Sequence, residues 1–370
     1  MPKASRMLTL GIETSCDETS CAVLEGLHTP RSNIVSSSLF RHKPFGGIVP
    51  EIASRHCLEQ IDCVLGEALK KGRVKLAGIN LIAVTQGPGL IGSLLVGISF
   101  AKALGFRLGV PVIGVNHLEA HLASNFIGNK EPKKYIGLLV SGGHTSLSYH
   151  EGGRMKILGE TVDDAVGEAF DKVAKILKLG FPGGPVIDAL AKEGDPAAVK
   201  FTAPKQKNGS RRRFNFSFSG IKTAVFYHVE NIQGFRESGK PGRNIRIRPP
   251  QARRALKISR TVCRNIAASF QKAVVTWLVE KTIAAAHFKK VRDIVVGGGV
   301  SANSHLRSML EQAAAESGFR VWFPPLALTG DNALMIARRG LELYRQGHRT
   351  PLDFSADPNI KFGSSCGGDA

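Results

Sequence analysis

Short apolar runs separated by polar turns recur along this chain. Residues 8–13 and 20–24 flank one polar stretch, and residues 136–140 and 145–149 flank another. Apolar runs of this length between turn residues are typical of buried strands. Each pair therefore predicts a strand, a polar turn and a returning strand. Because the plan occurs twice, we expect an internal duplication into two lobes that each open with a hairpin.

The segments between and after these hairpins alternate between helical and strand patterns. That alternation predicts an α/β architecture in which helices cover the faces of a sheet. The predicted strands cover residues 81–85, 111–115 and 294–296. The predicted helices cover residues 57–71, 93–104, 164–177 and 251–287, a stretch that begins near 302, and residues 331–346.

The same pattern divides the chain into two lobes and a tail. We expect an N-terminal lobe over residues 8–135 and a C-terminal lobe over residues 136–345. A basic insert at about residues 205–260 belongs to the second lobe. Residues 346–370 form a polar tail, and its glycine-rich end after Asp353 is expected to be loose.

Lysine and arginine greatly outnumber the acidic residues. The chain carries 50 basic and 30 acidic side chains, a formal net charge of +20, and its pI is near 9.9. A polyanion such as nucleic acid is the natural partner of such a surface, and a basic compartment such as the mitochondrial matrix is the alternative reason for it. Within residues 231–260 the density of positive charge favours contact with a phosphate backbone over a merely solvated loop. The positive residues there are Arg236, Lys240, Arg243, Arg246, Arg248, Arg253, Arg254, Lys257 and Arg260.

Cysteine spacing and hydropathy restrict the class of protein. The six cysteines show no pair with the two-residue spacing of a zinc knuckle or a redox motif, so they are interpreted as reduced thiols of an intracellular protein. No apolar run is identified with the roughly 18 residues that span a bilayer. Residues 1–7 lack the apolar core of a signal sequence. We therefore expect no membrane partner.

Two histidines four residues apart, His117 and His121, follow a short apolar run. On a helix this spacing places both imidazoles on one face, so that they can hold one metal ion. The alternative is a purely structural pair, since this spacing also arises by chance. A zinc peptidase would need a glutamate directly after the first histidine, whereas Glu119 lies about 200° around the helix from it. A third ligand is expected from elsewhere, and Asp331 is the candidate.

Glycine-rich turns at residues 140–145, 182–185 and 297–303 are candidate ligand contacts. Backbone without β-carbons can approach a phosphate closely and donate its N–H groups to it. Tight turns between packed elements are the structural alternative. The three turns together, none of them a Walker loop, favour a nucleotide held between two lobes.

Carboxylates cluster around the second of these turns. Asp163 and Asp164 lie at the start of the helix predicted over residues 164–177, where acidic residues also stabilise the helix start without any ligand. Asp171 and Asp188 flank the turn itself and are the better candidates to bind the hydroxyls or the amine of a ligand.

Several short motifs follow one another in order along the chain. Together they resemble the tRNA N6-threonylcarbamoyladenosine transferase family, called TsaD and formerly the glycoprotease family. The match covers about residues 8–345. The motifs are Gly11-Ile12-Glu13-Thr14-Ser15-Cys16-Asp17-Glu18-Thr19, the His117 and His121 pair, Leu139-Val140-Ser141-Gly142-Gly143-His144-Thr145, Gly167-Glu168-Ala169-Phe170-Asp171-Lys172, Pro182-Gly183-Gly184-Pro185, Phe216-Ser217-Phe218-Ser219-Gly220-Ile221-Lys222-Thr223, Gly297-Gly298-Gly299-Val300-Ser301-Ala302-Asn303 and Asp331-Asn332.

The resemblance implies an actin/hexokinase-like (ASKHA) two-lobed fold with a duplicated core. It implies transfer of a threonylcarbamoyl group from threonylcarbamoyl-AMP to the N6 amine of the adenosine beside the anticodon (adenosine 37), in tRNAs that read ANN codons. By the matching motifs, His117, His121 and Asp331 would form the catalytic centre and hold one divalent metal ion, iron or zinc. The residues that would contact the substrate are Leu139, Val140, Ser141, Gly142, Gly143, Asp171, Gly184, Asp188 and Asn303.

Members of the resembled family differ in their partners. Bacterial members work with small accessory proteins, archaeal and cytosolic eukaryotic members within a kinase-containing complex, and mitochondrial members as homodimers. The basic composition and the bacterial-like motifs favour the mitochondrial type, a homodimer in the matrix that depends on an upstream adenylate-forming enzyme. A bacterial-type cytoplasmic protein is the alternative. A metal-dependent endopeptidase and a non-catalytic nucleotide-binding module are the competing functions.

Overall fold

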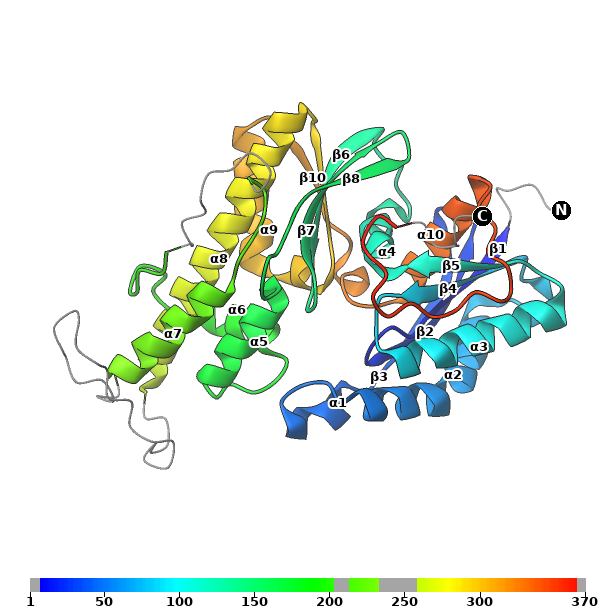
Figure 1. The fold of residues 1–370 in the computed structure, drawn as a ribbon, viewed down its shortest axis with the longest axis horizontal. Coiled ribbons are helices and arrows are strands. Elements are labelled where there is room, and N and C mark those ends of the chain that lie inside the picture. Colours follow the sequence, from blue (N-terminus) through cyan, green and yellow to red (C-terminus); the bar gives the residue numbers. More distant parts are fainter. Residues whose placement is uncertain (1–6, 203–212, 233–257, 365–370) are drawn as a thin grey trace.

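The computed structural model of the protein describes residues 7–202, 213–232 and 258–364. These residues form two lobes, each built on a five-stranded sheet (Figure 1). Most of the basic stretch 231–260, for which phosphate contact is predicted, lies outside the described residues.

The first lobe carries one sheet between helices. Its elements are β1 (Leu8–Glu13), β2 (Glu18–Glu25), β3 (Thr29–Ser37), β4 (Leu81–Gly87), β5 (Val112–Asn116), α1 (Leu39–His42), α2 (Pro50–Gly72), α3 (Ile91–Leu108), α4 (His117–Ala123) and α10 (Ala333–Arg345). The strand order is β3-β2-β1-β4-β5. β1, β2 and β3 pair antiparallel, whereas β4 and β5 continue the sheet in parallel with β1.

Alternation along β1 shows how the sheet is sandwiched. Leu10 and Ile12 are fully buried in a cluster with residues of α2 and α3. Gly11 points to the opposite face, where α10 crosses so closely that a β-carbon at this position would lie 2.1 Å from the Ala333 carbonyl oxygen. Only glycine allows this approach. The start of α10, next to Asp331, is therefore held against the end of β1.

The second lobe repeats the sheet of the first. Its elements are β6 (Lys134–Val140), β7 (Thr145–Glu151), β8 (Arg154–Glu160), β9 (Asp293–Gly297), β10 (Arg320–Trp322), α5 (Val166–Ile176), α6 (Gly183–Ala191), α7 (Ser219–Ile232), α8 (Arg260–Lys289) and α9 (Ser304–Glu316). The strand order is β10-β9-β6-β7-β8, with an antiparallel β6-β7-β8 meander and parallel β9 and β10. The plan matches that of the first sheet strand for strand, which confirms the predicted duplicated α/β architecture.

The long helix α8 forms the centre of the second core. Fifteen of its residues are buried, and Phe270 meets Phe170 of α5 edge to face with ring centroids 5.1 Å apart. Phe216 and Phe218, which precede α7, pack around Trp277 of α8. Burial of this much aromatic surface accounts for the position of α5 and α7 against α8.

Several elements differ from the predicted ones. The turn at 182–185 opens a helix, α6, where it was expected only to end the preceding one. The hairpin strands β3 and β8 were not predicted, because each is half-exposed and lacks a continuous apolar run. The predicted second lobe, residues 136–345, includes α10, which packs on β1, β2 and β4 of the first sheet. The chain thus returns to the first lobe after the second, which the order of the predicted elements did not show.

The tail is the clearest correction. Its residues up to 364 were expected to be loose beyond Asp353, yet Phe354, Ile360 and Phe362 are buried. Isolated apolar residues in a polar segment give no periodic signal, so the sequence pattern concealed this packing.

One helix is longer and more apolar than expected, because no apolar run long enough to span a bilayer was identified in the sequence. Among the described helices, α3 alone has the length and apolar composition to cross a membrane, with a hydropathy of 1.5 over its 18 residues. One such helix is weak evidence, because the core helices of soluble proteins meet the same criterion. Here α3 packs against β4 and α2 within the first lobe.

Candidate metal centre

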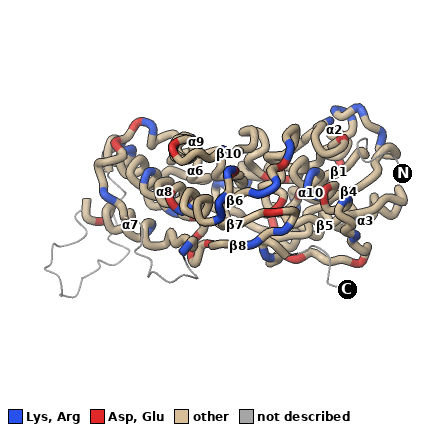
Figure 2. Tube along the Cα trace, turned by 90° about the horizontal axis from the view of Figure 1, so that it is seen from above, with Lys and Arg blue, Asp and Glu red and all other residues tan. Residues whose placement is uncertain are grey.

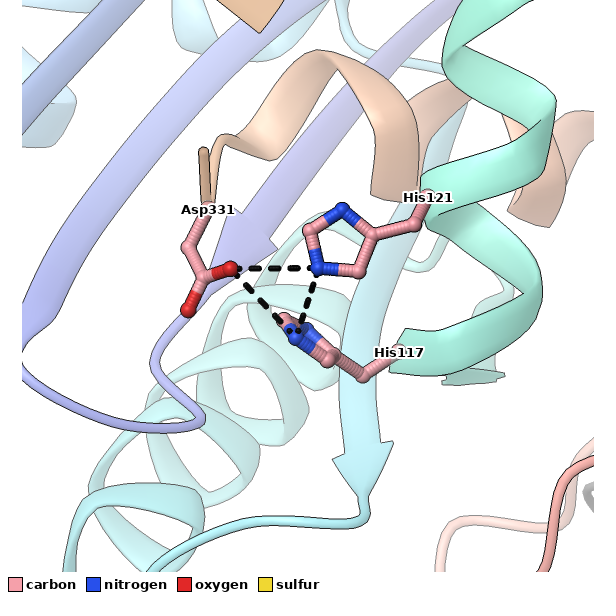
Figure 3. Close-up of side chains that lie close together, drawn as sticks. All are labelled: His117, His121 and Asp331. Carbon is pink, nitrogen blue, oxygen red and sulfur yellow. Dashed lines mark hydrogen bonds and ion pairs between the residues drawn. The ribbon is translucent and has the colours of Figure 1, made fainter. Parts of the chain in front are cut away.

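His117 and His121 lie on α4, the short helix that directly follows β5. The Asn116 side chain accepts a hydrogen bond from the Leu118 N–H at 3.0 Å and thereby caps the helix. The helical spacing then brings both imidazoles to one side (Figure 3). Their residues are buried, with exposed fractions of 8% and 1%.

Asp331, which precedes the N-cap residue Asn332 of α10, places its carboxylate beside the two histidines. Its Oδ1 lies 3.2 Å from His121 Nε2 and 3.4 Å from His117 Nε2, and the two Nε2 atoms are 3.1 Å apart (Figure 3). Ligand atoms of a tetrahedral metal at bond lengths of 2.0–2.1 Å would be about 3.3–3.4 Å apart. The spacing of the three side chains would thus fit one divalent ion. Within the described part of the chain this is the group of three with metal-ligand chemistry.

A buried carboxylate stands behind the first imidazole. Glu13, at the end of β1, places Oε2 2.9 Å from His117 Nδ1. The same oxygen accepts from the Thr85 hydroxyl at 2.6 Å, and Oε1 accepts from the Ser15 N–H at 2.6 Å. Glu13 is fully buried. A carboxylate on one ring nitrogen fixes the tautomer of a histidine and leaves the other nitrogen for a metal.

The charges of this cluster are strongly coupled. Burial alone would lower the pKa of His117, but the facing Glu13 and Asp331 carboxylates raise it well above its ordinary value. Burial lowers the pKa of His121 and prevails there over its carboxylate partner. Burial would raise the pKa of Asp331, yet the two imidazoles hold it far below its usual range. With both carboxylates ionised and both imidazoles neutral the cluster carries two negative charges, so protonation of His117 leaves one of them and a divalent cation would balance both.

Glu119 lies on the same helix but belongs to another contact. Its Oε2 pairs with the Arg339 guanidinium at 2.7 Å, and Arg339 also pairs with Glu342 at 3.2 Å. This ion pair ties α4 to α10 on the side away from the histidine pair. As predicted from the helical angle, the carboxylate that a zinc peptidase requires is not presented to the two imidazoles.

The glycine turn between β6 and β7 lies near the histidine pair. Burial, followed by the nearby His117 and His121, lowers the pKa of His144 to about 4. The turn is held from behind by α5, because the Gly167 N–H donates to the Ser141 carbonyl at 3.2 Å and the Glu168 N–H to the Gly142 carbonyl at 3.1 Å. Gly297 and Gly298 join the turn to α4, because a β-carbon on Gly297 would lie 2.7 Å from the His121 carbonyl oxygen and one on Gly298 would lie 2.4 Å from the Val140 carbonyl oxygen. This turn of the second lobe is therefore close to the helix that carries the histidines.

Comparison with known proteins decides the family of the chain. Residues 30–338 match the family model described as TsaD: tRNA N6-adenosine threonylcarbamoyltransferase. The protein of that name from Thermosipho africanus is 47% identical over 96% of this chain and 100% of its own length. That from Symbiobacterium thermophilum is 46% identical over 98% and 99%. The chain belongs to the TsaD family.

Solved structures show the fold beyond this family. HypF from T. kodakarensis aligns with a TM-score of 0.60 at 13% identity, over 92% of this chain and 48% of that chain. The Acidaminococcus fermentans (R)-2-hydroxyglutaryl-CoA dehydratase component A aligns with a TM-score of 0.50 at 14% identity, over 92% and 98%. These similarities confirm the actin/hexokinase-like fold.

The remaining substrate residues expected in a TsaD chain occupy distinct settings. Leu139 and Val140 are fully buried in β6, so only their backbone can meet a ligand. Gly142 and Gly143 are exposed, and a β-carbon on either would meet only open space. Ser141 is half-buried and its hydroxyl accepts from the His144 N–H at 3.1 Å.

The carboxylates and the amide of this set are engaged with the protein itself. Asp171 accepts from the Gly183 N–H at 2.7 Å, beside Gly184 at the start of α6. Asp188 accepts from the Ser304 hydroxyl at 2.9 Å. Asn303 caps α9 through the Leu306 N–H and donates to Gln271 at 2.8 Å. Asp188 and Asn303 are thus brought to one place, the junction of α6 with α9.

Asp163 and Asp164 have structural partners, but they do not cap the helix that follows them, which was the structural role expected. Asp163 accepts from the Phe218 N–H at 2.7 Å and from the Ser219 hydroxyl at 2.8 Å, which caps α7. Asp164 pairs with Lys172 at 2.6 Å and with Lys222 at 3.0 Å. The Phe-Ser-Phe-Ser motif therefore docks α7 onto the loop before α5.

Sequence reasoning did not assign a role to Glu13 in this TsaD chain. The available signal was an acidic residue in the last position of an otherwise apolar strand, where burial of a charge requires a partner. The partner, His117, follows 104 residues later.

Proposed function

We propose that the protein transfers a threonylcarbamoyl group from threonylcarbamoyl-AMP to the N6 amine of the adenosine beside the anticodon of tRNA. The observation that carries this proposal is the convergence of His117, His121 and Asp331 within a chain of the TsaD family. tRNA is the partner on which the family acts. Basic residues lie over both lobes of the described chain, and the net charge of +20 suits a polyanion (Figure 2).

The first lobe would hold the metal ion. When bound, a divalent ion supplies Lewis-acid polarisation of an acyl oxygen. His117, His121 and Asp331 offer two nitrogen donors and one oxygen donor, a set that suits iron or zinc. Glu13 would hold the His117 ring with Nδ1–H directed at its carboxylate, so that Nε2 stays available.

The second lobe would hold the adenylate. The exposed backbone of Gly142 and Gly143 can approach a phosphate. Gly184 and Asn303 lie at the starts of α6 and α9, which Asp188 joins through the Ser304 hydroxyl. The turn near His144 would bring the acyl end of that ligand next to the metal ligands. Orientation of the weakly nucleophilic adenine amine against this acyl group then supplies the catalysis, without a side-chain nucleophile.

Reconstitution tests the proposal. The purified protein is incubated with unmodified tRNA and threonylcarbamoyl-AMP made in place by an adenylate-forming enzyme, and nucleosides are analysed by mass spectrometry. We expect threonylcarbamoyladenosine from the metal-loaded wild type and at least 100-fold less from Asp331→Ala. Glu119→Gln is the matched control, because that carboxylate contacts Arg339 and not the histidines. Equal yields from Asp331→Ala and wild type would refute the proposal.

The competing functions predict other products in the same assay. A metallopeptidase would cleave an added protein in the presence of metal. The structure argues against this function, because Glu119, the carboxylate on α4, is paired with Arg339 and does not face the histidines. A nucleotide-binding module of this fold would bind the adenylate and yield no modified nucleoside.

A second copy of the chain is proposed to cover an apolar face of the first lobe. Leu58 on α2 is 68% exposed, and Ile91 and Leu95 on α3 are each 50% exposed. The two helices meet near these residues, since a β-carbon on Gly92 would lie 3.0 Å from the Ser54 side chain. We expect light scattering to show a dimer and Leu58→Glu to show a monomer. A monomeric wild type would contradict the homodimer.

The mitochondrial type is proposed together with the homodimer. A self-sufficient protein of that type needs only the adenylate-forming enzyme in the reconstitution. A requirement for small accessory proteins would instead favour the bacterial-type cytoplasmic alternative, and the relatives compared above are bacterial.

A further inference from the structure

The tail that follows α10 is attached along the free edge of the first sheet. β5 is the edge strand, and its Gly114 N–H donates to the Thr350 hydroxyl at 3.2 Å. On the neighbouring β4, the Gln86 side-chain amide donates to the Ser355 carbonyl at 3.1 Å, and the Gln86 backbone carbonyl accepts from the Asp357 N–H at 3.0 Å. In Figure 1 the red tail runs past β5 and β4 toward α4.

The approach to β4 is close enough to demand a particular residue. A β-carbon on Gly87 would lie 1.8 Å from the Asp357 carbonyl oxygen. Glycine at the end of β4 therefore permits the tail to lie directly on the sheet. The tail is therefore an integral part of the first lobe.

Asn116 joins the tail to the helix that carries the metal ligands. Its Oδ1 caps α4 through the Leu118 N–H at 3.0 Å, and its Nδ2 donates to the Lys361 carbonyl at 2.8 Å. The residue is 1% exposed. The Asn116 amide thus uses both its oxygen and its nitrogen, and the side-chain orientation that caps α4 is the same one that binds the tail.

The next tail residue belongs to the same buried apolar cluster as two leucines of this helix. Phe362, 6% exposed, belongs to a buried cluster with Leu118 and Leu122 of α4 and with Tyr135 and Leu139 of β6. Leu118 and Leu122 each follow one of the two histidines by one position. The aromatic ring therefore supports α4 where it passes between the first lobe and β6 of the second.

We propose that Lys361 and Phe362 form a clamp that positions α4 and its metal ligands, with Asn116 as the positioning residue through which the tail acts. The proposal rests on the metal centre of the proposed function. A helix of seven residues has too few internal hydrogen bonds to be rigid alone, so its orientation depends on its cap and on the side chains packed against it. Displacement of α4 changes the spacing between the two imidazoles and Asp331, and hence metal affinity.

Three variants of the full-length protein test the clamp. Asn116→Asp keeps an oxygen that can cap α4 but replaces the donor to the Lys361 carbonyl. Phe362→Ala removes the aromatic support, and Phe362→Leu restores an apolar side chain. Zn²⁺ affinity is measured by competition with a chromophoric chelator, and the exchange of α4 amides by hydrogen–deuterium exchange. We expect Asn116→Asp and Phe362→Ala to weaken Zn²⁺ binding about tenfold and to speed exchange in α4, and Phe362→Leu to recover most of both.

Phe354→Ala is the matched control. Phe354 is also a buried tail phenylalanine, 8% exposed, but it packs in the cluster of α2, α3 and β1 and does not belong to the cluster that contains α4. We expect it to lower the thermal midpoint while Zn²⁺ affinity stays within about twofold of wild type. Equal effects of Phe354→Ala and Phe362→Ala on α4 exchange, or no effect of either, would overturn the clamp. A wild type that binds no Zn²⁺ or iron would instead contradict the metal centre, while the exchange comparison would still decide whether the tail holds α4.

Discussion

Glu13→Gln removes one negative charge behind the metal ligands while nearly preserving the shape of the side chain. The carboxylate accepts three hydrogen bonds, from His117, Thr85 and Ser15, and is fully buried. Glutamine offers one carbonyl oxygen, so its amide nitrogen must face one of these donors. We expect the variant to fold, with weaker metal binding as its main defect.

The size of the defect follows from the hydrogen bond to His117. A bond to a buried carboxylate contributes about 1.5–3 kcal/mol, and a bond to a neutral carbonyl about 1 kcal/mol. The difference of about 0.5–2 kcal/mol corresponds to roughly a 2- to 30-fold change in affinity. Outer carboxylates of metal-bound histidines commonly show effects of 10- to 100-fold, so about tenfold is expected here.

The assay is a chelator competition for Zn²⁺ and Fe²⁺ on wild type, Glu13→Gln and Thr85→Val. Thr85→Val removes only the hydroxyl that holds the Glu13 carboxylate, so we expect a smaller loss of affinity than for Glu13→Gln. Glu119→Gln serves as control and keeps wild-type affinity, since its partner is Arg339. Wild-type metal affinity in Glu13→Gln, with an unchanged thermal midpoint, would refute the role assigned to this carboxylate.

Two predictions concern stability. Burial, followed by the nearby Glu342, raises the pKa of Glu131 to about 7. Between about pH 5 and 7 the carboxyl is therefore protonated in the folded protein and ionised in the unfolded chain. The free energy of unfolding should then fall as the pH rises through this range. In urea unfolding, Glu131→Gln should therefore be about 1–3 kcal/mol more stable than wild type at pH 8 and nearly equal to it at pH 5, and no gain at pH 8 would contradict this. Asp163→Ala removes the cap of α7 and should cost about 1–2 kcal/mol with no change in metal affinity, and a thermal midpoint equal to that of wild type would contradict the capping role.

Much of the local structure follows from the sequence because its causes are local. Alternating apolar runs and turns predict the two hairpins that open the sheets, and a four-residue spacing predicts that His117 and His121 share a helix face. The angle of Glu119 away from that face follows from helix geometry alone, and the structure pairs it with Arg339. Each of these inferences involves residues within one or two turns of backbone.

The remaining features depend on contacts between distant segments. Asp331 could be named as a candidate because it opens a helix, but nothing near it in sequence shows that α10 crosses the first sheet. That crossing depends on Gly11, whose missing β-carbon admits the Ala333 carbonyl. A glycine inside an apolar strand signals some close approach, without identifying the segment that approaches.

The position of α4 explains why residues remote in sequence meet at the site. One side of this helix presents two imidazoles to Glu13 and Asp331, while the helix also pairs with Arg339 and shares a buried apolar cluster with Phe362. Its seven residues therefore contact β1, the start of α10, the body of α10 and the tail. Since the cap at Asn116, the ligand Asp331 and the apolar packing of Phe362 all come from outside the helix, a change in any of these three should alter metal affinity before it unfolds a lobe. Metal affinity is for this reason a more sensitive measure of the placement of α4 than thermal stability.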